Sequence, residues 1–203
     1  MTTSAGNPML DFLLARRSAG TLGAPGPTRA QLDQMLLAAG TVPDHGRLRP
    51  FRFAVIEGDG RAAFGEALAR VAAERRPETP AAALAKMRDK AQRSPTIIVV
   101  IASPKPGKIE IWEQHVTAAC AGYAVMLAGY ALGVGAVWKS VPFTRGTALT
   151  ELFGLAETEE MLGWIHVGTP TADEATAVRP ALDLGTTAIV VDGNGVTAYR
   201  PSS

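Results

Sequence analysis

The sequence of 203 residues predicts one α+β domain over residues 1–203, in which a small mixed sheet is surrounded by helices. Helix-type and strand-type patterns alternate along the chain without the regular short spacing of a doubly wound sheet. The segment 95–103, PTIIVVIAS, is a short run of branched residues between turn formers, as in a strand covered on both faces. The segment 116–138 carries no charged residue, and its first part predicts a long helix buried in the domain or at a subunit interface.

The first half of the chain contains clear helix signals. Leu10, Leu13 and Leu14 follow the i, i+3, i+4 spacing of a short helix that ends near the segment ARRS. Thr28 and Gln31 form a capping-box pattern ahead of a second helix. Gly40 is its predicted stop. A strand over 51–56 and helices over about 61–76 and 81–93 follow.

The second half places the long helix between strands. The central strand 95–103 precedes it, and the Gly-Val-Gly break at 133–135 separates it from a strand near 135–138. We expect a helix capped by Thr144, a strand over 161–168 and, at the end, two strands joined by the turn DGNG. No sequence feature assigns a functional role to the extension 172–203.

Composition narrows the function classes. Twenty Lys and Arg against nineteen Asp and Glu give a net charge of +1, so no general attraction to nucleic acid or anionic membranes is expected. The start, MTTSAGNPMLDF, does not resemble a signal peptide, and the single cysteine, Cys120, has no partner for an internal disulfide. These features favour a cytoplasmic location, with Cys120 as a small core residue.

Segment 116–138 is long enough to cross a bilayer, which is an alternative to the buried helix. Ala, Gly and Thr dominate it where Leu, Ile and Phe are typical of a membrane span, and the break at 133–135 divides it. We therefore expect no membrane association.

Common motifs of other enzyme classes are missing. The piece GVGAVW fails the dinucleotide-binding pattern because Trp138 stands at the third glycine position and a helix, not a strand, precedes it. The chain has no Walker motif, no Gly-x-Ser-x-Gly elbow and no zinc-type spacing of His and Cys. No metal site is expected.

Two short segments carry candidate binding chemistry. Arg16, Arg17 and Ser18 offer two guanidinium groups and a hydroxyl that can hold a phosphate, although arginines at a helix end also complement the helix dipole. His45 lies in the segment PDHGRLRPF, which Pro43 and Pro50 restrict on either side. It is either a ligand contact or a loop histidine bonded to backbone. His115 and His166 lie in apolar segments and are expected to be structural or partly exposed.

Three segments in order, LLARRSAGTL, APGPTRAQLDQMLLAAGTVPDHGRLRPFRFAVIEG and GVGAVWKS, resemble one family. It is the small NAD(P)H-dependent, FMN-containing nitroreductases, in particular a single-module bacterial subgroup with an Arg-Arg-Ser start and a Pro-Asp-His loop. The resemblance covers about residues 8–170.

The resemblance implies a homodimer that binds FMN tightly but non-covalently. Each of the two flavin sites of this dimer is built from both subunits. It assigns the FMN phosphate and ribityl chain to Arg16, Arg17 and Ser18, a cofactor contact to His45, and the flavin edge to Trp138, Lys139 and Ser140. The cofactor performs the chemistry, so no catalytic side chain is expected. NADH or NADPH is the implied reductant in a ping-pong cycle, and nitroaromatics, quinones or similar small molecules are the implied acceptors.

One departure concerns Thr41, which stands where close relatives tend to carry an arginine that also reaches the cofactor. That contact is either missing or supplied by Arg47 or Arg49. Arg49 and Arg17 are also the cations that would favour the reduced flavin if they lie near its ring. Two alternatives remain open: a flavin-binding protein without turnover, and a relative with different flavin chemistry, such as dehydrogenation, dehalogenation or flavin fragmentation.

Overall fold

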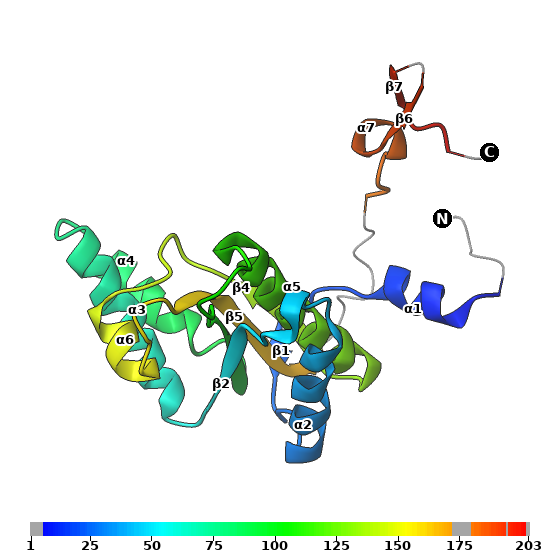
Figure 1. Ribbon diagram of the computed structural model, residues 1–203. Helices are drawn as coiled ribbons and strands as arrows, with labels where there is room; N and C mark the ends of the chain where they lie inside the picture. The colour runs from blue at the N-terminus through cyan, green and yellow to red at the C-terminus, as the bar shows by residue number, and fades with distance from the viewer. Residues whose placement is uncertain (1–5, 172–179, 194, 202–203) are drawn as a thin grey trace.

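The computed structural model describes residues 6–171, 180–193 and 195–201 (Figure 1). Its helices are α1 (Pro8–Ala15), α2 (Arg29–Ala38), α3 (Gly60–Arg75), α4 (Ala81–Lys90), α5 (Ile111–Ala131), α6 (Thr147–Phe153) and α7 (Leu184–Thr187). Its strands are β1 (Leu22–Gly23), β2 (Phe51–Glu57), β3 (Thr96–Ala102), β4 (Gly135–Lys139), β5 (Glu160–Pro170), β6 (Ile189–Asp192) and β7 (Gly195–Ala198). Short 3-10 turns occupy Ala39–Thr41 and His45–Arg47. The predicted α+β class is confirmed.

The main sheet is organised around β5, the longest strand. It pairs with β3, β4 and β1, and β3 pairs in turn with β2. Each of these pairings is antiparallel, whereas the sequence led us to expect a mixed sheet. Long segments that contain helices join the consecutive strands of this sheet, and connections of this length permit either direction of pairing.

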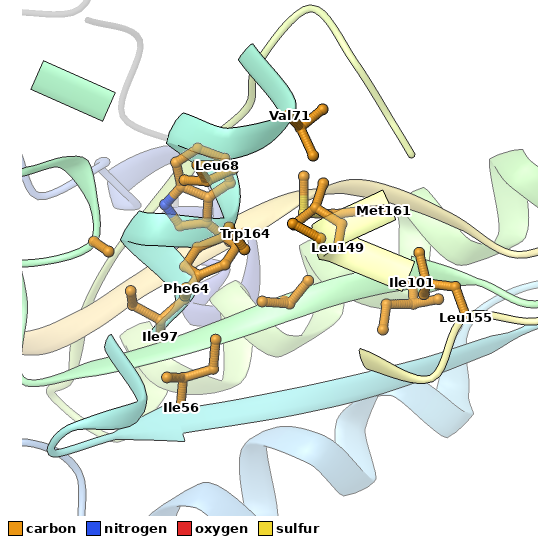
Figure 2. Packing of buried hydrophobic residues seen from close by; sticks show 14 of the residues in the cluster. Ile56, Phe64, Leu68, Val71, Ile97, Ile101, Leu149, Leu155, Met161 and Trp164 are labelled. Carbon is orange, nitrogen blue, oxygen red and sulfur yellow. The ribbon is translucent and has the colours of Figure 1, made fainter. Parts of the chain in front are cut away.

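β3 is the central strand that the sequence predicted, since all seven of its residues are buried. Its side chains alternate between two cores, as the period-two geometry of a strand requires. Ile97, Val99 and Ile101 belong to the core on the side of α3 and α6, with Phe64 and Trp164 among its large members (Figure 2). Ile98 and Val100 face the second core, which Leu32, Met35, Ala121 and Val125 from α2 and α5 complete. The sheet is therefore covered on both faces.

The predicted helix ends are correct in most places. Thr28 and Gln31 form the complete capping box at the start of α2, with the Gln31 amide donating to Thr28 Oγ1 over 3.2 Å. The predicted cap at Thr144 is wrong, because α6 begins three residues later behind Gly146, whose extended backbone sets the start without a side-chain bond. α4 ends at Lys90, before the predicted 93. The two-residue β1 and the four-residue α7 are too short to leave a periodic pattern.

α5 buries one face only. Its buried residues include Ala118, Ala121, Gly122 and Val125, which pack toward the sheet. On the other face an apolar stripe is exposed, formed by Trp112, Val116 and Tyr123 at 66%, 54% and 46% exposure. No helix in the described ranges is long and apolar enough to cross a membrane.

The carboxyl-terminal part forms a separate hairpin of β6 and β7, as the sequence predicted. Figure 1 shows it, with α7, apart from the main sheet. Its strands are exposed along their length, including Ile189 and Val191. The rest of the extension, 172–179, lies outside the described residues.

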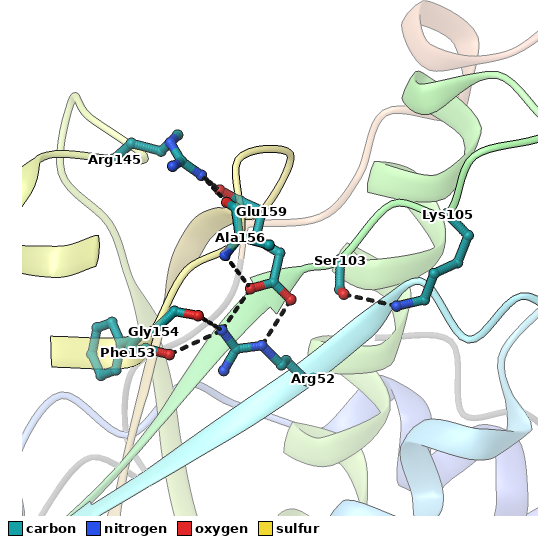
Figure 3. A network of polar contacts seen from close by, with 8 residues as sticks. All are labelled: Arg52, Ser103, Lys105, Arg145, Phe153, Gly154, Ala156 and Glu159. Carbon is teal, nitrogen blue, oxygen red and sulfur yellow. Dashed lines mark hydrogen bonds and ion pairs between the residues drawn. The ribbon is translucent and has the colours of Figure 1, made fainter. Parts of the chain in front are cut away.

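An ion pair fastens β2 to the turn before β5 (Figure 3). Arg52 donates from Nε and Nη2 to the two carboxylate oxygens of Glu159, over 2.8 and 2.6 Å, and from Nη2 to the carbonyl of Phe153. The Arg52 hydrogen bond lowers the pKa of Glu159 from its ordinary 4.5 to about 2. Arg145 donates to the Glu159 carbonyl from the loop ahead of α6. The turn is thus held through both the carboxylate and the backbone carbonyl of Glu159.

His166 lies on β5 in a second buried polar group. Its Nε2 accepts from Trp164 Nε1 over 2.9 Å, and its Nδ1 lies 2.8 Å from Ser94 Oγ. Because Nε2 accepts, the neutral ring carries its hydrogen on Nδ1, which donates to Ser94. Burial, together with the smaller effect of the nearby charges of Lys139 and Arg93, lowers the pKa of His166 from 6.5 to about 4. The predicted structural role of this histidine is confirmed.

Candidate functional site

The segment Arg16, Arg17 and Ser18 begins where α1 ends. Arg17 donates from Nη1 to the carbonyls of Leu14, Ala15 and Arg16 over 2.8 to 3.1 Å, so one of its nitrogens caps the helix end. This is the dipole-complementing role that the sequence left open, and it leaves Nε and Nη2 as donors. The Arg16 guanidinium lies over the ring of Tyr123 on α5, 5.9 Å from its centroid. Ser18 is exposed.

Trp138, Lys139 and Ser140 stand at the end of β4, near that segment. The amide of Ala19 donates to the carbonyl of Ala136 over 3.0 Å, so the chain after Ser18 runs beside β4. The Trp138 indole is half-buried and packs where α5 carries Gly122, at the same turn as Tyr123. Lys139 and Ser140 are exposed.

Gly163 on β5 is needed for this packing. Its φ of +148° is a conformation that favours glycine, and a Cβ there would lie 2.6 Å from the Lys139 carbonyl and 2.5 Å from Trp138 Nε1. Pairing between β3 and β5 shifts register at this point, where Leu162 is the extra residue. The bulge lets β4 and the Trp138 indole lie close against β5.

The second candidate segment, residues 43–50, is called the His45 loop. The carboxylate of Asp44 accepts from the amides of Leu48 and Arg49, over 3.1 and 2.8 Å. Gly46, Arg47 and Arg49 have φ of 78°, 54° and 46°, all in the left-handed region. For the two arginines this region is strained by roughly 1–2 kcal/mol each. A strained loop held by a carboxylate is a rigid loop, which suits ligand binding.

His45 projects from this loop toward α5. Its Nδ1 lies 2.9 Å from Glu113 Oε2, so its partner is a side-chain carboxylate and not the backbone group considered from the sequence. Thr117, one turn further along α5, donates from Oγ1 to the carbonyl of Pro43 over 3.2 Å. The first turns of α5 therefore hold both the side chain and the backbone of the loop.

A pocket of about 300 Å³ lies between the His45 loop and the start of α5. Trp112, Val116 and Ile109 supply its apolar wall, while His45, Glu113 and Thr117 supply polar groups. Cys120 also lines it and is half-buried, so the prediction of a core cysteine is only partly met. A larger open depression of about 500 Å³ between α3 and α6, near Arg75 and Arg145, contains no predicted site residue.

The remaining predicted residues lie close to the same loop. Thr41 is exposed, and its hydroxyl donates to the Ala38 carbonyl over 2.8 Å, which closes the turn after α2. Arg47 and Arg49 are exposed. Within the described part of the chain, neither guanidinium forms an ion pair. Either arginine is therefore available to an anionic ligand. This availability is required if Arg47 or Arg49 supplies the cofactor contact that Thr41 lacks.

The two groups of predicted residues do not meet within one chain. Arg16 contacts α5 at Tyr123, and His45 contacts it at Glu113. Ten residues of helix separate these points, which is about 15 Å along the axis. A ligand held by both groups in one chain would have to span this distance along α5.

Sequence reasoning missed three residues of the site. Asp44 shapes the loop, Glu113 holds His45, and Gln114 holds the neighbouring loop 105–109. The left-handed Gly46 two positions after Asp44 is a turn signal that could have suggested its role. Glu113 and Gln114 lie about seventy residues from the loop, and no local pattern marks them. The described residues contain no group of side chains that could hold a metal ion.

The donors of the two segments, residues 16–18 and 139–140, fit a flavin phosphate better than a neutral ligand. Two guanidiniums, the Lys139 ammonium and the hydroxyls of Ser18 and Ser140 all donate, and charge-assisted donors are the strong phosphate contacts. Trp138, next to Lys139 in the chain, adds a half-buried aromatic side chain. FMN has both the anionic and the aromatic part that this arrangement accommodates.

Comparison with known proteins gives one consistent result. The model of the nitroreductase family matches residues 13–169. The chain is 36% identical over 171 residues to "Putative NAD(P)H nitroreductase YdjA" of Escherichia coli (strain K12), covering 84% of this chain and 92% of that protein.

Solved structures agree in fold. A nitroreductase-like family protein from Bacillus cereus superimposes with a TM-score of 0.76 at 20% identity, covering 94% of this chain and all of the other. A nitroreductase with bound FMN from Bacteroides fragilis NCTC 9343 gives a TM-score of 0.68 at 21% identity, covering 91% and 100%. At these identities the likeness concerns the fold.

Proposed function

Because the chain belongs to the nitroreductase family, we propose that it is an FMN-dependent oxidoreductase, which takes electrons from NADH or NADPH and passes them to nitroaromatic, quinone or similar acceptors. The observation that carries the proposal is that Arg16 and Trp138 contact two neighbouring residues of α5, Tyr123 and Gly122. This turn of α5 therefore contacts both a candidate anion-binding segment and an aromatic residue, and a flavin nucleotide requires both.

In this proposal Arg16, Arg17 and Ser18 hold the phosphate and ribityl chain. Trp138, Lys139 and Ser140 lie along the edge of the ring system. When bound, FMN supplies the hydride and electron chemistry. The chain binds and orients it, and cations near the ring favour its reduced, more negative state. No side chain has to act as an acid or base.

We propose further that the site is completed by a second copy of the chain. The family resemblance supports this, and so does the exposed apolar stripe of α5, which a monomer leaves in water. The stripe spans the part of α5 that His45 and Arg16 contact. A two-fold axis near Ala119 would set the two α5 helices antiparallel and bring His45 of one copy toward Arg16 of the other. One ligand could then contact both groups, with His45 from one copy and Arg16 from the other.

The test is the absorbance of the purified protein, followed by anaerobic addition of NADH or NADPH. We expect a yellow preparation whose flavin band bleaches and then recovers when menadione or a nitroaromatic is added. A yellow protein that does not bleach would favour flavin binding without turnover. Bleaching without reoxidation by these acceptors would point to different flavin chemistry, and a colourless protein that takes up no FMN would reject the proposal.

A further inference from the structure

We propose that Glu113 is a positioning residue for His45, and that its carboxylate fixes the tautomer and direction of the imidazole that meets the flavin. The inference rests on the proposed function, because it concerns how the FMN site is built. It starts from one contact between distant parts of the chain, His45 Nδ1 to Glu113 Oε2 at 2.9 Å. Neither sequence patterns nor the family resemblance assigned a role to Glu113.

The backbone on both sides of this contact is anchored. On the helix side, Gln114 is 2% exposed and accepts from the Lys105 amide over 2.7 Å while donating to the carbonyls of Lys105 and Ile109 over 3.0 Å. On the loop side, Asp44 holds two backbone amides. Since both backbones are fixed, the freedom that remains at His45 is rotation of its own side chain, which the Glu113 contact restricts.

The contact also selects the hydrogen position on the ring. An ionised carboxylate only accepts, so Nδ1 must carry a hydrogen and donate it to Glu113. Nε2 is then the nitrogen available to a ligand, as an acceptor in the neutral ring and a donor in the charged one. Without Glu113 the neutral ring would exchange between two tautomers and present either nitrogen.

Stability does not explain the pair. The side chains of His45 and Glu113 are 65% and 32% exposed, and ion pairs this exposed contribute roughly 0–1 kcal/mol to folding. Both side chains line the pocket beside Trp112. An oriented pair at a pocket wall that adds little to stability is explained by what it presents to a ligand.

The experiment measures FMN affinity and apoprotein melting on Glu113→Ala and Glu113→Gln. Glu110→Ala is the matched control, because it removes the same charge at the same end of α5 from an exposed residue with no bond to His45. We expect Glu113→Ala to weaken FMN binding by about fivefold. Glu113→Gln should retain more affinity, since its amide oxygen still accepts from Nδ1. Apoprotein melting should be unchanged in both variants, and Glu113→Ala should have no further effect on FMN affinity when His45 is already alanine.

Nitrogen-15 NMR of the imidazoles provides a readout that does not use the flavin. The chain has only three histidines, so the signals can be assigned by single substitutions. His45 should show the Nδ1–H tautomer in the wild type and in Glu113→Gln, and a mixture in Glu113→Ala. If wild-type protein binds FMN but the Glu113 variants match Glu110→Ala in affinity and tautomer, the positioning role is wrong while the proposed function stands. A wild type that takes up no FMN overturns both.

Discussion

Arg49 has a strained backbone conformation, and its exposed guanidinium is a candidate ligand contact. Its φ of 46° suits glycine better than arginine, and the Asp44 carboxylate accepts its amide and so maintains this conformation. Glycine would adopt this backbone conformation at lower cost, so the arginine stands against the local backbone preference. This is the pattern of strain found at ligand sites.

The change Arg49→Gly separates strain from function. We expect the free energy of unfolding of the apoprotein to rise by up to about 1 kcal/mol, because the left-handed conformation then costs less, offset in part by the greater freedom of glycine when unfolded. FMN affinity or the rate of flavin reduction should fall, because a cation is lost. Urea unfolding and anaerobic stopped-flow reduction measure the two effects. Unaltered flavin behaviour would remove Arg49 from the site.

The changes Arg16→Ala and Ser18→Ala test the phosphate contacts. Removal of one charge-assisted hydrogen bond costs roughly 1.5–3 kcal/mol, so FMN affinity should fall by about ten- to a hundredfold for Arg16. The neutral Ser18 hydroxyl should matter less, by about fivefold. Fluorescence titration of the apoprotein with FMN measures both. Arg29→Ala, an exposed arginine on α2, is the control for loss of charge alone. Equal affinities in all three variants would contradict the assignment.

At the scale of secondary-structure elements, β5 connects the site to the core. It pairs with β4, which ends in Trp138 and Lys139, and its bulge at Gly163 admits the indole. The same strand carries His166, buried between Trp164 and Ser94. A change in the protonation of His166 therefore acts on the strand that supports the flavin side of the proposed site.

Stability should fall with acidification between pH 6.5 and pH 4. The pKa of His166 is lowered from 6.5 to about 4 in the folded protein, so the unfolded chain binds the proton more tightly across this range. The stabilisation is complete above pH 6.5 and is lost as the pH falls to 4, for a total of about 3 kcal/mol. The lowered pKa of Glu159 also stabilises the folded protein, and this stabilisation is lost as the pH falls from 4.5 to about 2.

Urea unfolding at pH 7, 5.5 and 4.5 would measure this effect. The variant His166→Gln should be less stable at pH 7 but should lose less stability than the wild type over the same range. His115→Gln serves as a control histidine on α5. Parallel pH dependence in wild type and His166→Gln would show that another group is responsible.

At the scale of the whole molecule, the exposed stripe of α5 is the feature that one chain leaves incomplete. Trp112, Val116 and Tyr123 face outward along about three turns of helix. Apolar residues grouped in this way mark an interface more often than a free surface. The stripe also spans the part of α5 that the two groups of site residues contact, so covering it and completing the flavin site are one event in the proposed dimer.

The change Val116→Glu should therefore abolish both dimer formation and FMN binding. A charge in the middle of an apolar interface cannot be paired, so we expect a monomer by light scattering at micromolar concentration. FMN should be lost with the partner, because His45 and Arg16 then remain apart. Leu37→Glu on α2, which is 75% exposed, is the matched control and should leave mass and colour unchanged. A monomeric wild type, or a monomeric variant that keeps its flavin, would reject the shared site.

Local sequence alone determined most of the elements and their order. The capping box at Thr28, the branched run of β3 and the Gly-Val-Gly break after α5 are short-range signals, because helices and strands depend on caps, periodicity and turn residues within a few positions. The resemblance of the Arg16 segment and the His45 loop to one family also came from the sequence, and the family match agrees with it.

Only the tertiary structure decided how these pieces meet. It paired His45 with Glu113, attached Arg16 to Tyr123, and let Trp138 lie against Gly122 and Gly163. These contacts join residues 16 to 107 positions apart. Each follows from the packing of α5, β4 and β5 around the two cores, which no window of local sequence contains. The same packing set the two candidate groups about 15 Å apart along α5. The proposed second chain, which the family resemblance already implied, is thus supported independently by the fold.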